Sequence, residues 1–222
     1  RYQEVTGVQT CALPICYTKH DPALPLYSVE DAWIAMERFK PDEFGKEYRL
    51  NDPLTFSLSR AGHILGAASV KISDGLTSIL FSGDLGRMHD PVMEAPVQIQ
   101  EADYLVLEST YGDRLHGDEN PLDKMETIIN KTAGRGGKVL IPSFAVGRSQ
   151  AILYYINELK KFNRIPRELP VFLDSPMAIN ATELWQKHHK EHRLTKNQCE
   201  EVFKGAHYLR TADRSEERRV GK

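Results

Sequence analysis

The sequence contains little cysteine, no long apolar run and no excess of positive charge. It has 3 cysteines in 222 residues, and none of them forms a CxxC pair. A disulfide scaffold and a cysteine zinc finger are therefore excluded, and a reducing compartment such as the cytoplasm is expected. No run reaches the roughly 18 apolar residues that cross a bilayer, so we expect no membrane partner.

Basic residues are slightly outnumbered by acidic ones. The chain has 29 lysines and arginines against 31 aspartates and glutamates, for a formal net charge of −2. A general positive field that would attract nucleic acid is absent. Any contact with a polyanion must therefore come from local groups, such as single arginines and helix N-termini.

The two ends of the sequence differ from its middle. Residues 5–15 read VTGVQTCALPI and residues 214–222 read RSEERRVGK, and both resemble translated sequencing adapters that flank an insert. Such segments are excluded from fold reasoning. We expect residues 1–16 and 214–222 to be non-native and the remainder to be an internal piece of a protein, the alternative being genuine disordered tails.

The apolar pattern predicts one helix followed by strands. Ser28 and Asp31 resemble a capping box, and the pattern after them predicts a helix of about eleven residues. From Tyr48 onward, apolar and polar residues alternate in LTFSLS, ASVKIS and TSILFSG, and YLVLEST follows. The pair Asp74-Gly75 predicts a tight hairpin turn. We therefore expect a mostly antiparallel β-layer with polar groups at its strand ends.

Helices and strands alternate in the second half of the chain. The pattern predicts a helix from Leu122 to Ala133, the strand KVLIPS, a helix over SFAVGRSQAILYYINELKKF, the strand VFLDS and a helix over MAINATELWQKHHKEH. Such alternation through short loops is typical of βαβ units with a parallel sheet. We place a domain boundary near Gly112.

Three polar residues follow the predicted strands of the β-layer. His63 lies between two glycines in RAGHILGA, where an imidazole can bind a metal through one nitrogen while the other is held by an acceptor. Asp84 follows ILFSG and has a hard oxygen that can ligate or bridge metals. Glu108 ends YLVLE, where an isolated buried charge is costly. The alternatives are an ordinary loop histidine, a turn or N-cap aspartate, and a strand-end salt bridge.

Two predicted helix starts carry groups that suit a phosphate. Ser143 and Arg148 lie near the start of the helix after KVLIPS, and Ser175 lies at the start of the helix after VFLD. Helix N-termini and arginines both favour phosphate oxygens. Plain N-capping is the alternative for both serines.

A zinc-peptidase pattern occurs near the end of the chain. His188, Glu191 and His192 spell HxxEH, the pattern of inverted zinc peptidases. The predicted helix is rich in charge, and no third acidic ligand has room before Asp213. We therefore interpret these residues as a solvated polar face.

Several motifs together resemble one family. GHILGAAS, FSGDLGR and LVLESTYGDR resemble successive motifs of the metallo-β-lactamase superfamily, and IPSFAVGRSQ and FLDSPMA resemble its β-CASP branch of RNA- and DNA-processing nucleases. The similarity covers nearly all of residues 26–192. It implies an α/β fold. Residues 17–112 would form a partial metallo-β-lactamase domain, which is a β-layer with helices. The first part of a β-CASP domain, with a parallel sheet and flanking helices, would follow at residues 113–213.

The resemblance also implies a function and a role for each site residue. It makes His63 a zinc ligand and Asp84 the carboxylate that bridges two zinc ions. Glu108 falls at the acidic motif, which works in the family beside a downstream histidine near the scissile phosphate. The implied activity is hydrolysis of RNA phosphodiester bonds, with single-stranded RNA as the partner and a homodimer as one option for assembly.

The sequence departs from the family pattern in its metal motifs. The main motif, HxHxDH, has no counterpart before His63, where His20 stands alone in KHDP, and two later histidine motifs are absent. Two ligands are fewer than the three of a catalytic zinc site, so we expect this chain to bind zinc weakly and to be inactive. Two other functions stay open: a hydrolase of small esters or thioesters, and a metal-free scaffold subunit of an RNA-processing complex.

Overall fold

The computed structural model describes residues 27–99, 101–115, 117 and 119–210. The chain divides into two compact units, residues 1–42 and 43–222. The predicted non-native ends, residues 1–16 and 214–222, lie outside the described residues.

In the first unit the structure describes one helix, α2 (Val29–Met36). Ser28 Oγ accepts a hydrogen bond from the backbone N–H of Asp31 at 3.1 Å, and the Asp31 carboxylate accepts one from Ser28 N at 2.8 Å. The predicted capping box is therefore confirmed. The helix has 8 residues rather than about eleven, and none of them is buried, so little packing is available to extend it.

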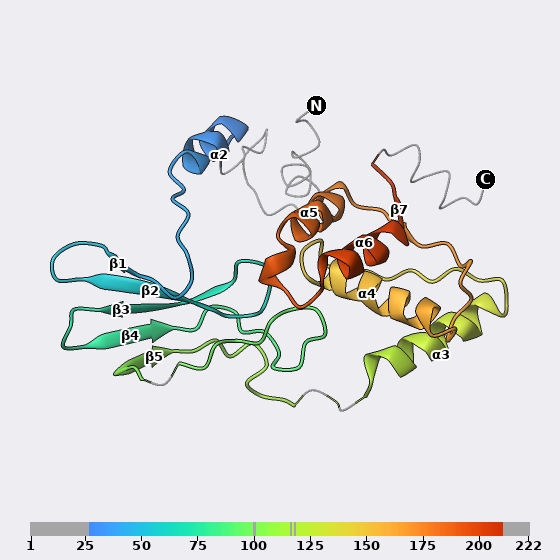
Figure 1. The fold of residues 1–222 in the computed structure, drawn as a ribbon, viewed down its shortest axis with the longest axis horizontal. Coiled ribbons are helices and arrows are strands. Elements are labelled where there is room, and N and C mark those ends of the chain that lie inside the picture. The colour runs from blue at the N-terminus through green and yellow to red at the C-terminus, as the bar shows by residue number, and fades with distance from the viewer. Residues whose placement is uncertain (1–26, 100, 116, 118, 211–222) are drawn as a thin grey trace, which may run out of the picture. The chain divides into compact units, whose positions relative to one another are not determined.

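The second unit begins with a five-stranded sheet in the order β1-β2-β3-β4-β5 (Figure 1). Its strands are β1 (Glu47–Arg49), β2 (Thr55–Arg60), β3 (Ala68–Ser73), β4 (Ser78–Phe81) and β5 (Tyr104–Val106). The first four are antiparallel neighbours, and β5 pairs parallel with β4. Because β2 and β4 both oppose β3, strands β2, β4 and β5 run in one direction, and their carboxyl ends lie at one edge of the sheet.

The hairpin between β3 and β4 is the one that the sequence predicts. The Asp74 carboxylate accepts hydrogen bonds from the backbone N–H groups of Leu76 at 2.9 Å and Thr77 at 2.7 Å. An aspartate that bonds its own turn in this way favours a tight reversal of the chain. The predicted, mostly antiparallel β-layer is confirmed.

Four α-helices and a small parallel sheet follow β5 in the described ranges (Figure 1). They are α3 (Pro121–Ala133), α4 (Arg148–Lys161), β6 (Phe172–Leu173), α5 (Pro176–Lys187), the 3-10 helix η1 (His189–Glu191), α6 (Lys196–Lys204) and β7 (His207–Tyr208). Strands β6 and β7 pair parallel. The predicted mixed α/β class is therefore confirmed.

Two predictions about the start of α4 were wrong. Residues 138–143, the predicted strand KVLIPS, form no strand, and Leu140 is 86% exposed. A strand needs a neighbour to satisfy its backbone groups, and no described strand pairs with this segment. The helix also begins at Arg148 rather than near Ser143, because Gly147 has a φ of +80°, outside the range of a right-handed helix.

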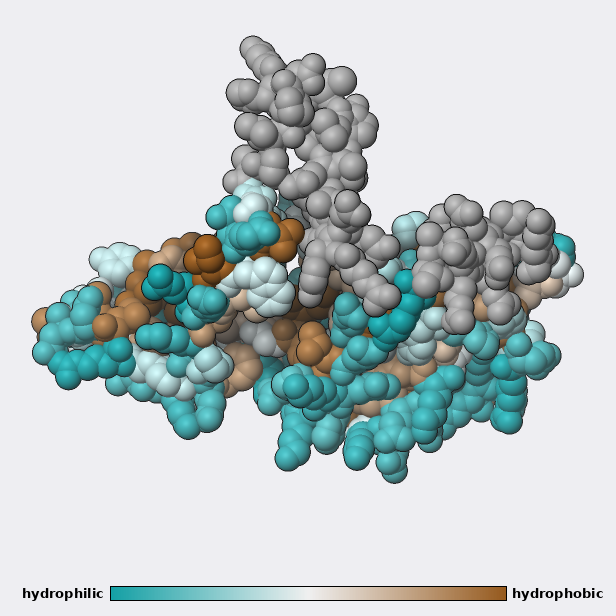
Figure 2. All heavy atoms as spheres, turned by 90° about the horizontal axis from the view of Figure 1, so that it is seen from above, coloured by the Kyte–Doolittle hydropathy of each residue, from teal (hydrophilic) through white to brown (hydrophobic). Residues whose placement is uncertain are grey.

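The helices enclose two apolar clusters. The larger one is formed by Val92, Met93, Leu153, Trp185, Leu194, Cys199, Val202 and Phe203. The smaller one is formed by Ile129, Ile156, Leu159 and Ile165. The buried apolar side chains of α4 divide between them, with Leu153 in the larger cluster and Ile156 and Leu159 in the smaller one. Outside these clusters, hydrophilic side chains dominate the helical region on the face seen in Figure 2.

The segment after β4 is tied to the helical region. Val92 and Met93 belong to the larger cluster, and Arg193 holds their backbone. The Arg193 N–H donates to Val92 O at 2.8 Å, and its Nε donates to Met93 O at 2.7 Å. The loop that carries Asp84 is therefore continuous with a buried anchor.

The prediction of a solvated HxxEH face was wrong for His192. Its ring is 4% exposed and stacks on Trp185 with 4.5 Å between ring centroids. Helix α5 ends at Lys187, so the pattern does not lie on one helix, and Glu191 instead pairs with Arg60 at 3.3 Å.

No described helix is long and apolar enough to cross a membrane.

Candidate functional site

Three predicted site residues follow strands that end at one edge of the sheet. His63 lies in the loop after β2, Asp84 in the loop after β4, and Glu108 two residues after β5. The shared strand direction explains why residues far apart in the sequence lie at the same edge.

The loops that carry His63 and Asp84 contact each other through their backbones. Gly62 and Leu85 form an antiparallel bridge, and Gly86 N donates to Ala61 O at 2.8 Å. A Cβ atom at Gly86 would lie 1.9 Å from the Gly62 carbonyl oxygen, so the approach requires glycine. His63 and Asp84 each adjoin a residue of the bridge and are therefore brought together.

Glu108 is held against the Asp84 loop. Its Oε1 accepts a hydrogen bond from Leu85 N at 2.6 Å, and its Oε2 accepts one from Thr110 Oγ1 at 2.7 Å. The Leu85 bond first and the Thr110 bond next lower the pKa of Glu108 below its usual value, although burial opposes them, and nearby His63 adds to the lowering. The carboxylate is therefore ionised at neutral pH, and His63 lies near it.

The strand-end salt bridge considered for Glu108 does not form within the described part of the chain. Its carboxylate instead accepts hydrogen bonds from a backbone N–H and a hydroxyl. Its own N–H donates to Ser82 Oγ at 3.0 Å, so the end of β5 is joined to the end of β4. Among the described residues, this network fixes the carboxylate without a salt bridge.

The donors at this edge match part of a zinc site. His63 and Asp84 are both exposed, and their imidazole nitrogen and carboxylate oxygen are donors that zinc takes. In the ranges that the structure describes, no three histidine, cysteine, aspartate or glutamate side chains gather in a way that could hold a metal ion. The two residues therefore fit two positions of a zinc site, and the described chain does not complete it.

The N-terminus of α4 lies beside the His63 loop. A Cβ atom at Gly147 would lie 3.0 Å from Ile64 Cγ2 and 4.0 Å from the His63 carbonyl oxygen. Arg148 is the first residue of α4 and is exposed. The predicted phosphate-binding arginine therefore begins its helix next to a predicted zinc ligand.

The two candidate serines have different roles at their helices. Ser143 does not cap α4, whose N-cap is Gly147, so the capping alternative was wrong; its Oγ lies 2.9 Å from Ser149 Oγ. Ser175 is the N-cap of α5 and accepts a hydrogen bond from Ala178 N at 3.2 Å, so capping is confirmed there.

The starts of α4 and α5 lie close together. Gln150 Nε2, in the first turn of α4, donates to Ala178 O at 3.4 Å and to Thr182 Oγ1 at 2.9 Å. The amide therefore bridges the two helices at the ends where Arg148 and Ser175 lie.

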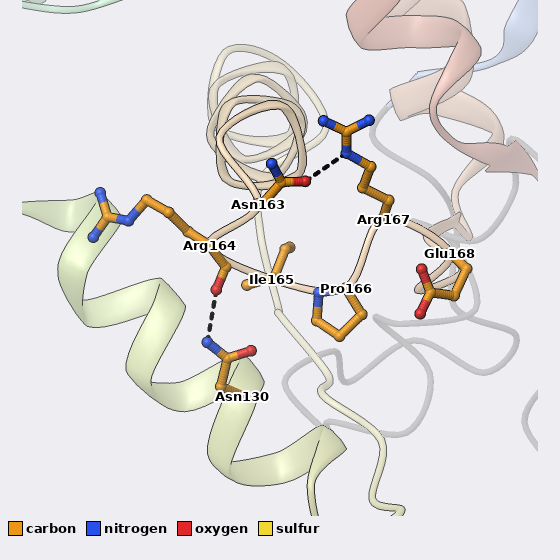
Figure 3. A pocket seen from close by; sticks show the side chains of 7 residues that line it. All are labelled: Asn130, Asn163, Arg164, Ile165, Pro166, Arg167 and Glu168. Carbon is orange, nitrogen blue, oxygen red and sulfur yellow. Dashed lines mark hydrogen bonds between the residues drawn. The ribbon is translucent and has the colours of Figure 1, made fainter.

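An open hollow of about 460 Å³ lies elsewhere, at the carboxyl end of α4 (Figure 3). It is lined by Asn130, Asn163, Arg164, Ile165, Pro166, Arg167 and Glu168. Arg164 already pairs with Asp123 and Glu126 of α3, and Arg167 Nε donates to Asn163 Oδ1 at 2.7 Å. None of the predicted site residues lines this hollow, so we do not assign it to the site.

Known proteins with similar sequences identify the family. Ribonuclease TTHA0252 of Thermus thermophilus is 37% identical over 186 residues, which cover 83% of this chain and 40% of that protein. A model of the Beta-Casp domain matches residues 149–222. The chain contains part of a β-CASP domain. The predicted resemblance is thus confirmed.

Further relatives of this β-CASP chain are similar over most of its length. The RNase J-like protein of Methanocaldococcus jannaschii is 34% identical over 168 residues, 73% of this chain and 39% of that protein. Cleavage and polyadenylation specificity factor 73 of Drosophila melanogaster is 32% identical over 163 residues, 72% of this chain and 24% of that protein. The chain therefore spans two fifths or less of the length of these relatives.

Proposed function

We propose that this β-CASP chain is part of a metal-dependent ribonuclease that hydrolyses RNA phosphodiester bonds in RNA processing or decay. The observation that carries the proposal is that the segments carrying His63, Asp84 and Glu108 contact one another at one sheet edge. The similarity to proteins named as ribonucleases supports RNA as the substrate.

His63 and Asp84 would hold zinc in the complete protein, which would use two ions. Zinc supplies a nucleophile by lowering the pKa of a bound water and neutralises charge on a phosphate. Asp84 would bridge the two ions and orient the attacking oxygen. Its loop is fixed for this role by the Gly86 bond and by Glu108.

Glu108 would act at the scissile phosphate beside a histidine from elsewhere in the complete protein. It is ionised and is held by two hydrogen bonds. A fixed carboxylate of this kind can orient a protonated imidazole that gives its proton to the leaving oxygen.

The phosphate contacts would come from the starts of α4 and α5 and from the loop before α4. Arg148 would bind a backbone phosphate by a charge-assisted bond, and Ser143 and Ser175 would add hydroxyl donors. The Ser175 oxygen accepts a hydrogen bond from Ala178 N, which leaves the hydroxyl proton of Ser175 for a ligand.

We further propose single-stranded RNA as the partner, a homodimer as the assembly, the cytoplasm as the location and a domain boundary near Gly112.

Zinc binding and RNA binding by this chain test the proposal. We expect weak zinc binding in a competition titration with a chromophoric chelator, and at least a tenfold loss for His63→Ala and for Asp84→Asn, since each removes one of two donors. His188→Ala is the control, because His188 is an exposed histidine at the end of α5 and should change nothing.

Labelled single-stranded RNA is the second probe. We expect salt-dependent binding without turnover, because the described residues do not complete the metal site. Zinc binding that survives both substitutions would refute the assigned ligands. Hydrolysis of a thioester in place of RNA binding would refute the proposed substrate.

A further inference from the structure

Arg87 is an arginine beside the candidate site to which the sequence motifs assign no role. It follows Asp84 by three residues, and its backbone is fixed on both sides. Gly86 N donates to Ala61 O at 2.8 Å on one side, and Asp90 N donates to Arg87 O at 3.4 Å on the other. The Arg87 side chain is exposed, so the hydrogen-bonded loop presents a cation to the solvent.

The anchor on the carboxyl side of Arg87 is strong. Asp90 Oδ1 accepts hydrogen bonds from Val92 N at 2.8 Å and from Met93 N at 2.7 Å, and Val92 and Met93 are 1% and 5% exposed. The position of Arg87 relative to the helices is therefore set by buried contacts.

Arg148 and Tyr155 lie on one face of α4. They are seven residues apart, which is close to two helical turns, about 10 Å along the axis. Burial raises the pKa of the Tyr155 hydroxyl, and Asp90 raises it further, while Arg87 and Arg148 both act to lower it. The glycine before each arginine lies against the His63 loop, because a Cβ atom at Gly86 would lie 2.8 Å from His63 N and one at Gly147 would lie 4.0 Å from the His63 carbonyl oxygen. The two arginines therefore start beside the same loop, one from the Asp84 loop and one from α4.

Neither arginine is neutralised by a close acid. Among the described residues, no carboxylate lies within salt-bridge distance of Arg87 or Arg148, whereas Arg60, Arg114, Arg164 and Arg210 all have such partners. The oxygen Oδ1 of Asp90, the nearby carboxylate, is engaged by two backbone N–H groups. Asp90 offsets one of the two positive charges near the Tyr155 hydroxyl, and the remaining positive charge favours the binding of an anion there.

We propose that Arg87 and Arg148 form a clamp for a single backbone phosphate of RNA, next to His63 and Asp84, with the Tyr155 hydroxyl as a further donor. The proposal rests on the proposed function, because that function supplies the RNA. Two planar guanidinium groups can each donate two parallel hydrogen bonds to phosphate oxygens. The clamp would supply the local positive charge that the net charge of −2 does not provide.

The test measures the affinity of the chain for a fluorescein-labelled single-stranded RNA by anisotropy at several salt concentrations. Arg87→Ala and Arg148→Ala should each weaken binding about tenfold, as expected for a charge-assisted contact. The double variant should weaken binding by less than the product of the two, because both side chains hold the same phosphate. Its salt slope should fall by about 0.7, the value for a single phosphate on a single strand.

Conservative and control variants separate the clamp from a structural effect. Arg87→Lys should keep the salt slope but bind less tightly, because lysine keeps the charge and loses the paired bonds. Tyr155→Phe should weaken RNA binding slightly and leave its salt slope unchanged. Arg167→Ala removes an arginine at the other end of α4 and should bind like the unaltered chain. Thermal melts that match the unaltered chain confirm that each variant is folded.

Each outcome decides between the clamp and the proposed function. If the unaltered chain binds RNA and Arg87→Ala binds like Arg167→Ala, the clamp is wrong and the proposed function stands. If the loss of affinity in the double variant equals the product of the two single losses, and its salt slope falls by twice the expected amount, the arginines hold separate phosphates and the clamp is again wrong. If the unaltered chain does not bind RNA at low salt, both proposals are overturned.

Discussion

Replacing Gly86 by alanine should separate the two loops that form the candidate site. The added Cβ would lie 1.9 Å from the Gly62 carbonyl oxygen and 2.8 Å from His63 N. Both neighbours are backbone atoms of a loop that also carries His63, so no flexible side chain can move aside. Relief of the collision requires the His63 loop to move away from the Asp84 loop.

The cost follows from the contacts that this movement breaks. The Gly86 N to Ala61 O hydrogen bond contributes about 1 kcal/mol, and forcing a methyl group into a filled space costs about 1–3 kcal/mol. We therefore expect a loss of about 2–4 kcal/mol in the free energy of unfolding. At a typical slope for urea, the unfolding midpoint should fall by roughly 1–2 M.

Urea unfolding at 25 °C measures this loss, and the chelator competition measures its effect on the site. Gly117→Ala is the matched control, because a Cβ atom there would have no atom within 4 Å, and its effect should stay within about 0.5 kcal/mol. Zinc affinity should fall for Gly86→Ala and not for Gly117→Ala. Equal stability and equal zinc affinity of the two variants would refute the contact between the loops.

Two further predictions concern the helical region. Trp185→Ala should lower the free energy of unfolding in urea by about 3–5 kcal/mol, because the Trp185 side chain is 1% exposed. Trp33→Ala is the control and should lower it by less than about 1 kcal/mol, because Trp33 is 57% exposed. Equal losses would contradict the assignment of Trp185 to the core. Burial lowers the pKa of His192, so as the pH falls below about 6.5 the unfolded chain takes up a proton before the folded chain does. The free energy of unfolding should therefore fall from pH 7 to pH 5. The fall should be less steep in His192→Gln, and in the control His188→Gln it should be as steep as in the unaltered chain. An equally steep fall in His192→Gln would disprove this role of His192.

Features that depend on neighbouring residues were predictable from the sequence. The Ser28 capping box, the Asp74 turn and the helix α3 depend on hydrogen bonds and periodicity within a few residues. The alternation in β2, β3 and β4 likewise reflects the two faces of a strand. The positions of His63, Asp84 and Glu108 after strands were also predictable, whereas their roles in a site stay predictions.

Features that depend on distant residues were not predictable. KVLIPS has the composition of a strand, but a strand forms only with a partner, and no described strand pairs with it. His192 lies in a polar stretch, yet Trp185 and the turn after α5 bury its ring. The start of α4 was placed wrongly because the left-handed φ of Gly147 belongs to the contact with Ile64.

The sequence by itself therefore determined which chemical groups the candidate site is predicted to contain, since motif residues and strand ends are local features. Only the tertiary structure decided how these groups meet. The bridge between Gly62 and Leu85, the bond of Glu108 to Leu85, and the contact of Gly147 with Ile64 all join segments that are more than twenty residues apart. Such contacts depend on strand order and on packing between elements, which no local pattern encodes.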